Sequence, residues 1–263
     1  MDLGIAGRSA VVAAGSAGLG RAVAEALAAE GVRLTIGARG RATLERTASE
    51  IRARYGVEVL AHPVDVGDPE AVAGFVRAAE ARFGAVDILV TNAGGPPPTR
   101  LKDTTPDDWR RALEENLLSC VNLVRAALPG MIARRWGRIL AIASVSVKQP
   151  VPDIILSNTA RSGVAGFMKS VANEAAPHNV LANVLCPGYT RTARLVELAS
   201  HLATKRGVPE QKIYAAWAED IPLGRVGEPE EFGAAAAFLA SERASYITGT
   251  VLAVDGGHIR SVT

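Results

Sequence analysis

Residues 10–20 read AVVAAGSAGLG, an apolar run that leads directly into a cluster of glycines, and a helical pattern follows over Arg21–Ala29. The apolar run has the composition of a buried strand. Glycines at a strand-to-helix junction let the backbone approach a ligand closely, and the first turn of the helix offers free N–H groups. We expect a loop that binds the pyrophosphate of a dinucleotide, with a simple tight turn as the alternative. The expected contacts are Gly15, Ser16, Gly18, Leu19 and Gly20.

The same alternation of apolar runs and helical-period segments continues along the chain. Strand and helix pairs are expected at Arg33–Ile36 and Ala42–Arg54, Val57–Val64 and Pro69–Phe83, Asp87–Thr91 and Pro106–Leu128, and Arg138–Ser144 and Ser157–Ala176, followed by Val180–Cys186, Pro229–Leu239 and Val251–Val254. Continuously apolar strands are typical of a parallel sheet with helices on both faces. The predicted fold class is α/β, a doubly wound parallel sheet of Rossmann type, in a single domain over residues 1–263.

One irregular stretch interrupts this pattern, from Tyr189 to about Pro229. A long insertion in a compact domain usually covers a binding site, so residues 189–229 are predicted to form a substrate lid. Several apolar side chains in it indicate either a hydrophobic substrate pocket or the lid's own packing. They are Leu195, Leu198, Ile213, Trp217 and Ile221.

The composition excludes several classes of protein. With 48% apolar residues, 21% charged residues and a net charge of +2, the chain can bury a large core but lacks the charge of a nucleic-acid binder. The basic run 134–138 is expected to be a solvated turn. Four scattered histidines show no ligand spacing, so no metal site is expected.

The expected location is the cytoplasm. The N-terminus has no signal-peptide pattern, and no apolar run is expected to reach the roughly 18 residues of a membrane span. The two cysteines, Cys120 and Cys186, have the apolar surroundings of free thiols in a reducing compartment.

The end of the second strand bears on which dinucleotide is bound. NAD-binding proteins usually place an acidic residue there for the ribose 2′-hydroxyl, but residues 36–40 read IGARG. Arg39 is suited to a 2′-phosphate, which favours NADP, with NAD possible and an ordinary exposed arginine as the alternative.

Further motifs follow the glycine loop in a fixed order: DV at 65–66, TNAG at 91–94, Asn116, Ser144 and PGYTRT at 187–192. This series resembles the short-chain dehydrogenase/reductases, especially their β-ketoacyl-ACP-reductase-like members. The resemblance implies a small-molecule substrate and a homotetramer or homodimer, and it makes Asn116 and Ser144 catalytic. The further cofactor contacts that it implies are Asp65, Val66, Asn92, Ala93, Gly94, Pro187, Gly188, Thr190 and Thr192.

The sequence departs from the family at two places. Ala13 and Ala14 stand where the family's glycine loop has Thr and its first Gly, and Gly15 is expected to supply the missing flexibility. At 157–161 the chain reads SNTAR, so Ser157 and Arg161 replace the family's Tyr-x-x-x-Lys pair.

The second departure changes the acid chemistry. In the family the tyrosine donates a proton to the substrate oxygen, and the lysine lowers the tyrosine pKa and holds the ribose. An aliphatic hydroxyl is far less acidic than a phenol, whose pKa is about 10. Arg161 lies on the same helix face as Ser157, keeps a positive charge and is expected as a further cofactor contact, to the ribose. Two substitutes for the acid are open: Lys148, otherwise a solvated loop charge, and Tyr189, otherwise an aromatic that packs in the lid.

The leading hypothesis is an NAD(P)-dependent oxidoreductase that acts on a carbonyl or alcohol with a non-standard proton donor. Loss of the acid need not abolish reaction, because general acid catalysis contributes about 10²–10⁴-fold and positioning alone about 7–11 kcal/mol. The alternatives are a non-redox catalyst on the same scaffold, such as a cyclase, lyase or dehydratase, and a catalytically silent nucleotide-binding protein.

Overall fold

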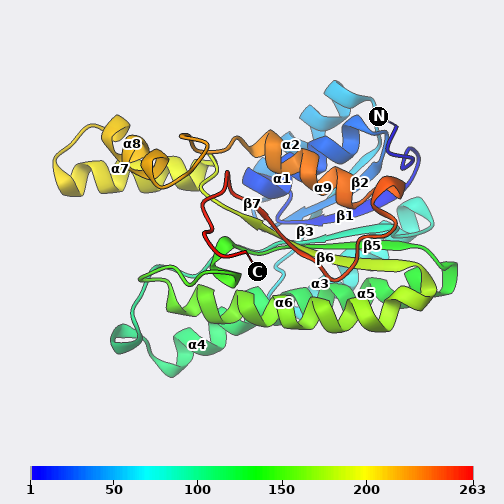
Figure 1. The fold of residues 1–263 in the computed structure, drawn as a ribbon. Helices are drawn as coiled ribbons and strands as arrows, with labels where there is room; N and C mark the ends of the chain where they lie inside the picture. The colour runs from blue at the N-terminus through cyan, green and yellow to red at the C-terminus, as the bar shows by residue number, and fades with distance from the viewer. Residues whose placement is uncertain (1, 263) are drawn as a thin grey trace.

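The predicted strands form one seven-stranded parallel sheet in the computed structural model, which describes residues 2–262 (Figure 1). The strand order is β3-β2-β1-β4-β5-β6-β7. The strands are β1 (Ser9–Ala13), β2 (Arg33–Ala38), β3 (Val59–Pro63), β4 (Ile88–Thr91), β5 (Gly137–Ile142), β6 (Val180–Pro187) and β7 (Val251–Val254). The chain order reverses between β1 and β4, which places a topological switch point at their carboxyl ends.

Helices cover both faces of the sheet, so the doubly wound fold is confirmed. One face carries α1 (Gly18–Ala29), α2 (Arg41–Tyr55) and α9 (Pro229–Leu239), and the other carries α3 (Pro69–Phe83), α5 (Ser119–Arg134) and α6 (Ile155–Ala175) (Figure 1). Because both faces are covered, residues that point to either face are buried in the five inner strands, which explains why these strands are apolar without alternation. The edge strands β3 and β7 are partly exposed.

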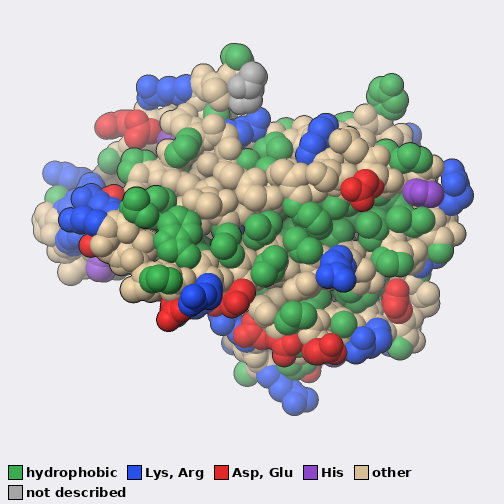
Figure 2. Space-filling view, turned by 90° about the horizontal axis from the view of Figure 1, so that it is seen from below, with side chains coloured by type: hydrophobic (Ala, Val, Ile, Leu, Met, Phe, Trp, Pro, Cys, Tyr) green, Lys and Arg blue, Asp and Glu red, His purple; other side chains and the backbone are tan. Residues whose placement is uncertain are grey.

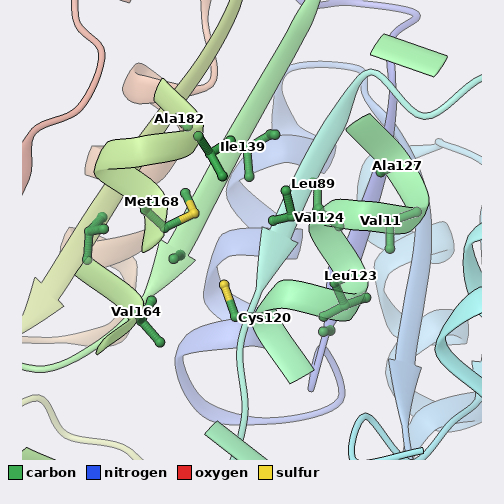
Figure 3. Close-up of a cluster of buried hydrophobic side chains, with 14 of the residues drawn as sticks. Val11, Leu89, Cys120, Leu123, Val124, Ala127, Ile139, Val164, Met168 and Ala182 are labelled. Carbon is green, nitrogen blue, oxygen red and sulfur yellow. The ribbon is translucent and has the colours of Figure 1, made fainter. Parts of the chain in front are cut away.

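Each face has its own apolar core. Figure 3 shows the cluster beneath α5 and α6, where Leu123 and Val124 of α5 and Met168 of α6 pack toward Leu89 and Ile139 of the sheet. Close packing of this kind fixes the strand ends, and with them the loops that carry polar residues at one edge of the sheet.

The long helix predicted at 106–128 differs from expectation. It comprises α4 (Pro106–Leu113), a π-helical turn (Glu114–Leu118) and α5, which continues through Pro129 to Arg134. Proline removes one backbone hydrogen bond from a helix, but the fully buried Met131, two residues further on, packs α5 into the core under the sheet.

By length and composition the helical run Pro106–Arg134 is apolar enough to cross a membrane, with a mean hydropathy of 1.3 over its best window. The expectation that no segment meets this criterion was therefore wrong. One side of the run packs inside the protein, because α5 contacts α3, β4, β5 and α6, and 39% of the apolar window is buried.

The basic run at 134–138 is only partly the solvated turn that the sequence indicates. Arg138 is 1% exposed, and its Nη2 lies 3.3 Å from Glu242 Oε2. Its guanidinium carbon also lies 4.4 Å from the centre of the Trp136 ring. The run therefore contains a structural arginine that ties β5 to the segment after α9.

The segment between β6 and α9 folds into two helices, α7 (Ala193–Arg206) and α8 (Glu210–Glu219), which extend away from the sheet (Figure 1). Its apolar side chains mostly pack within it: Leu195 and Ile221 lie in one small cluster and Ile213 in another, with Trp217 against both. Leu195, Ile213, Trp217 and Ile221 therefore pack within the segment and do not form a hydrophobic substrate pocket. The fifth side chain, Leu198, is exposed.

Figure 2 shows the molecule from the side on which α5 and α6 lie. Hydrophobic side chains gather across much of this face, in contrast to the charged residues at its borders. Leu118, at the end of the π-helical turn, is a large hydrophobic residue that is 46% exposed.

Candidate active site

The glycine loop joins β1 to α1 with a strained residue at its start. Ala14 has a φ of +48°, in the left-handed region that costs an L-residue about 1–2 kcal/mol. Gly15 does not take a positive φ, so the expectation that Gly15 supplies the flexibility was wrong. A Cβ on Gly15 would lie 3.0 Å from the Val12 carbonyl oxygen and 3.1 Å from Ile36 Cβ, so this glycine serves close packing instead.

The rest of the loop fits a pyrophosphate. Gly18 has a φ of +54°, and a Cβ on Gly20 would lie 2.2 Å from the Ala14 carbonyl oxygen. Ala17 precedes α1 without a side-chain cap, so the N–H groups of the first turn are free for an anion. The loop therefore has both the donors and the space that a dinucleotide needs.

A cleft of about 720 Å³ extends from this loop along the carboxyl ends of the strands. Most of the predicted cofactor contacts line it, namely Ser16, Gly18, Leu19, Arg39, Asp65, Val66, Asn92, Ala93, Gly94, Arg161, Pro187, Gly188 and Thr192. Gly15, Gly20 and Thr190 do not line the cleft. Gly20 instead lies against the Asn92 amide, and Thr190 Oγ1 donates to the Gly188 carbonyl.

Two residues expected to contact the adenosine half of the cofactor, Arg39 and Asp65, follow the neighbouring strands β2 and β3 and line the cleft. Arg39 follows β2 and makes no hydrogen bond or ion pair within the described residues 2–262. Asp65 is held by the Gly67 backbone N–H, which donates to Asp65 Oδ1 at 3.0 Å. The guanidinium of Arg39 is thus free to bind a phosphate, while the Asp65 carboxylate is fixed.

The other end of the cleft brings Ser144, Ser157 and Arg161 together. Ser144 caps the short turn after β5 and accepts a hydrogen bond from the Ser146 N–H. Ser157 is 8% exposed on the first turn of α6, and Arg161 follows one turn later, with its Nε donating to Ser157 Oγ at 3.3 Å. All three side chains line the cleft.

Arg161 is fixed by the sheet as well as by its own helix. Its Nη1 donates to the carbonyl oxygens of Ile142, at 3.2 Å, and Ala143, at 2.9 Å. Burial, and then the nearby charge of Arg194, lower the Arg161 pKa to about 10. The guanidinium therefore stays charged near neutral pH.

Asn116 lies in the π-helical turn and is 5% exposed. Its Nδ2 donates to the Ala112 carbonyl, whereas its Oδ1 is buried without a partner. It lines a small cavity of about 10 Å³ that Arg161 and Ser119 also line. This volume is close to that of one water molecule, and the unpartnered oxygen supplies an acceptor for it.

Comparisons with known proteins agree with this geometry. A family model described as enoyl-(acyl carrier protein) reductase matches residues 13–258. The 3-oxoacyl-(acyl-carrier-protein) reductase of Salmonella typhimurium is 36% identical over 95% of this chain and 97% of its own length. This chain belongs to the short-chain dehydrogenase/reductase family. It is thus similar to enzymes that are oxidoreductases, and the predicted fold and family are confirmed.

Two further members of the short-chain dehydrogenase/reductase family are similar over nearly their full length. The D-β-hydroxybutyrate dehydrogenase of Cupriavidus necator is 34% identical over 96% of this chain and 98% of its own. The L-sorbose reductase of Gluconobacter frateurii, solved with NADPH and L-sorbose, has 33% identity and a TM-score of 0.96, with all of both chains covered.

Neither of the two suggested acid substitutes lies in the cleft lining of this short-chain dehydrogenase/reductase. Tyr189 stacks on Trp217, with ring centres 5.2 Å apart, and meets His258 edge-on. Burial, and then the nearby Asp220, raise the Tyr189 pKa, which makes it a weaker acid. Lys148 follows the turn after Ser144 and is partly exposed.

Sequence reasoning missed two charged residues of the cleft, Glu115 and Arg194. Arg194, the second residue of α7, lines the cleft, and its Nη1 is 3.4 Å from the Gly95 carbonyl oxygen that it contacts. The signal in the sequence was a cation two residues after the family's PGxxxT motif, which ends at Thr192. Only the fold shows that this cation points to Gly95, after β4.

Proposed function

We propose that this chain is an NADP-dependent reductase of carbonyl compounds that works without the family's tyrosine acid. The observation that carries the proposal is the single cleft, which has a pyrophosphate loop at one end and Ser144, Ser157 and Arg161 at the other. Cofactor and substrate would therefore meet beside these three side chains. The similarity to named reductases and dehydrogenases over nearly the full chain supports a redox reaction.

The proposed cofactor site uses residues from both halves of the sheet. Gly18, Leu19 and Ser16 would hold the pyrophosphate, Asp65 and Val66 the adenine, and Arg39 the 2′-phosphate. Bound NADPH supplies the hydride that a carbonyl carbon accepts. NADP is favoured over NAD because Arg39 is unpartnered and no acidic residue lies in 36–40, and because the similar L-sorbose reductase was solved with NADPH.

Charge that develops on the substrate oxygen would be stabilised by the Ser144 and Ser157 hydroxyls and by Arg161. Hydrogen-bond donors that are fixed before the reaction stabilise such charge without reorganising, and Arg161 is fixed by Ile142 and Ala143. We propose that the proton comes from water, which enters through the cavity beside Asn116. The missing phenol would limit the enzyme to carbonyls that are already reactive.

The helical segment 189–229 is proposed as the substrate lid. Its helix α7 begins directly after Thr192, which lies near Gly18, and it contributes Arg194 to the cleft. The small apolar clusters inside α7 and α8 give the segment a core of its own, so it is suited to move as a unit.

The proposal extends to location and assembly. Cys120 and Cys186 are both free and buried, as expected for the cytoplasm. The homodimer or homotetramer that the resemblance implies would place a second copy on the apolar face over α5 and α6 (Figure 2). Sedimentation of the purified protein checks the assembly, and a monomer at micromolar concentration would contradict it.

The cofactor assignment is tested with Arg39→Ala, using calorimetric titration with NADPH and NADH. Loss of a charged hydrogen bond to the 2′-phosphate is expected to weaken NADPH binding by about 10–100-fold and to leave NADH binding unchanged. Arg41→Ala is the matched control, because Arg41 is an exposed arginine two residues on that does not line the cleft. Equal losses for both cofactors would show that Arg39 does not bind the 2′-phosphate.

A further inference from the structure

Two guanidinium groups meet at the reacting end of the cleft. A Cβ placed on Gly95 would lie 2.9 Å from Arg194 Nη1 and 3.5 Å from Arg161 Nη2, so both groups reach the same point from different elements. Arg161 comes from α6, and Arg194 comes from the first turn of α7. Gly95 is the residue that leaves room for both.

No carboxylate within the described residues 2–262 neutralises this pair. The hydrogen bonds of Arg161 go to Ser157 and to two backbone carbonyls, and the bond of Arg194 goes to the Gly95 carbonyl. By contrast, the neighbouring Arg191 is paired with Glu228 at 3.0 Å. The pair at Gly95 therefore holds two like charges together without an acidic partner.

The acidic residues of the cleft lie at its other end. Asp65 is bound to the Gly67 N–H, and Glu115 approaches the same glycine. Burial lowers the pKa of Arg161 most, and the nearby charge of Arg194 lowers it further. Two cations that disfavour each other favour an anion that contacts both.

We propose that Arg161 and Arg194 bind the carboxylate of an oxo acid substrate, with the carbonyl beside Ser144 and Ser157. This inference rests on the proposed reductase function and names its substrate class. Arg161 lies next to Ser144 through its bonds to Ile142 and Ala143, so a bound carboxylate would lie close to the reacting carbonyl. A carboxylate one or two carbons from the carbonyl satisfies that spacing.

Two features favour a substrate carboxylate over the cofactor's pyrophosphate. The pyrophosphate already has donors in the first turn of α1, whereas the reacting end offers no other cation that lines the cleft. In addition, Arg194 is on the proposed lid, so contact with a bound anion would hold α7 against the cleft.

The test compares an oxo acid with its methyl ester in Arg194→Gln. We expect kcat/KM for the acid to fall by about 10–100-fold, mainly through KM, and at least tenfold more than for the ester. Arg194→Lys should recover part of the loss. Arg191→Gln is the matched control, because it removes a charge three residues away that does not line the cleft.

Binding measurements separate this inference from the proposed reductase function. Calorimetry of oxamate, a dead-end analogue, with the enzyme and NADP should show binding that Arg194→Gln weakens by the same factor, whether or not any substrate turns over. If Arg194→Gln instead raises the Kd for NADPH and lowers kcat/KM equally for the acid and the ester, the arginine pair binds the cofactor, and the inference is overturned. Unchanged oxamate binding in Arg194→Gln would also overturn it.

Discussion

Ser157 and Arg161 lie one helical turn apart on α6, and they contact each other through Arg161 Nε and Ser157 Oγ. The serine is too short and too weak an acid to replace a phenol, whose pKa is near 10. The arginine is held by backbone carbonyls rather than by an acid, so its charge remains available to the cleft. The residue pair thus supports stabilisation of an oxyanion more than donation of a proton.

Ala14 offers a residue-scale test of the glycine loop. Since its φ is +48°, Ala14→Gly should remove backbone strain and raise the free energy of unfolding by about 1 kcal/mol. Ala13→Gly is the control: Ala13 ends the extended strand β1, where glycine should lower the free energy of unfolding by roughly 0.5–1 kcal/mol. Urea unfolding measures the free energy of unfolding of both variants. A lower value in Ala14→Gly than in the unchanged protein would contradict the claim that the Ala14 backbone is strained.

At the scale of elements, α9 shows how local electrostatics fixes the helices around the cleft. The Glu231 carboxylate accepts two hydrogen bonds from the Arg225 guanidinium, at 2.7 and 2.8 Å, and one from the Glu228 backbone N–H, at 2.8 Å. The Arg225 hydrogen bond, followed by the backbone one, lowers the Glu231 pKa to about 2. These contacts join the end of the proposed lid to the start of α9.

This contact predicts a pH-dependent loss in Glu231→Gln. Because the folded pKa of Glu231 lies below its ordinary value, its contribution is complete above about pH 4.5 and is lost as the pH falls toward about 2. The carboxylate is half exposed, so the expected loss at pH 7 is only about 1 kcal/mol. Glu230→Gln is the control, since it removes a first-turn charge with no such bonds.

Urea unfolding at pH 7 and pH 3 checks this prediction. The difference between Glu231→Gln and Glu230→Gln should shrink at the lower pH. A difference that stays the same at both pH values would show that the carboxylate's charge contributes nothing.

At the scale of the whole molecule, the sequence predicts the sheet well because the inner strands are continuously apolar and buried on both faces. The ordered motifs around Asp65, Asn92 and Ser144 likewise predict which loops meet at the cleft. What the sequence could not show depends on three-dimensional proximity: Ala14 takes the left-handed conformation beside Gly15, and Arg194 reaches Arg161 across Gly95. No spacing along the chain connects positions 95, 161 and 194.

The whole-molecule account is that one cleft joins an NADP site to a reacting end without a phenol acid. The most direct test is single-turnover reduction of an oxo acid with NADPH that carries deuterium at the transferred position of the nicotinamide. The account predicts one deuterium on the carbinol carbon of the product alcohol, at a rate that Arg194→Gln reduces. Product without deuterium, or no product from any oxo acid although NADPH is bound, would contradict it.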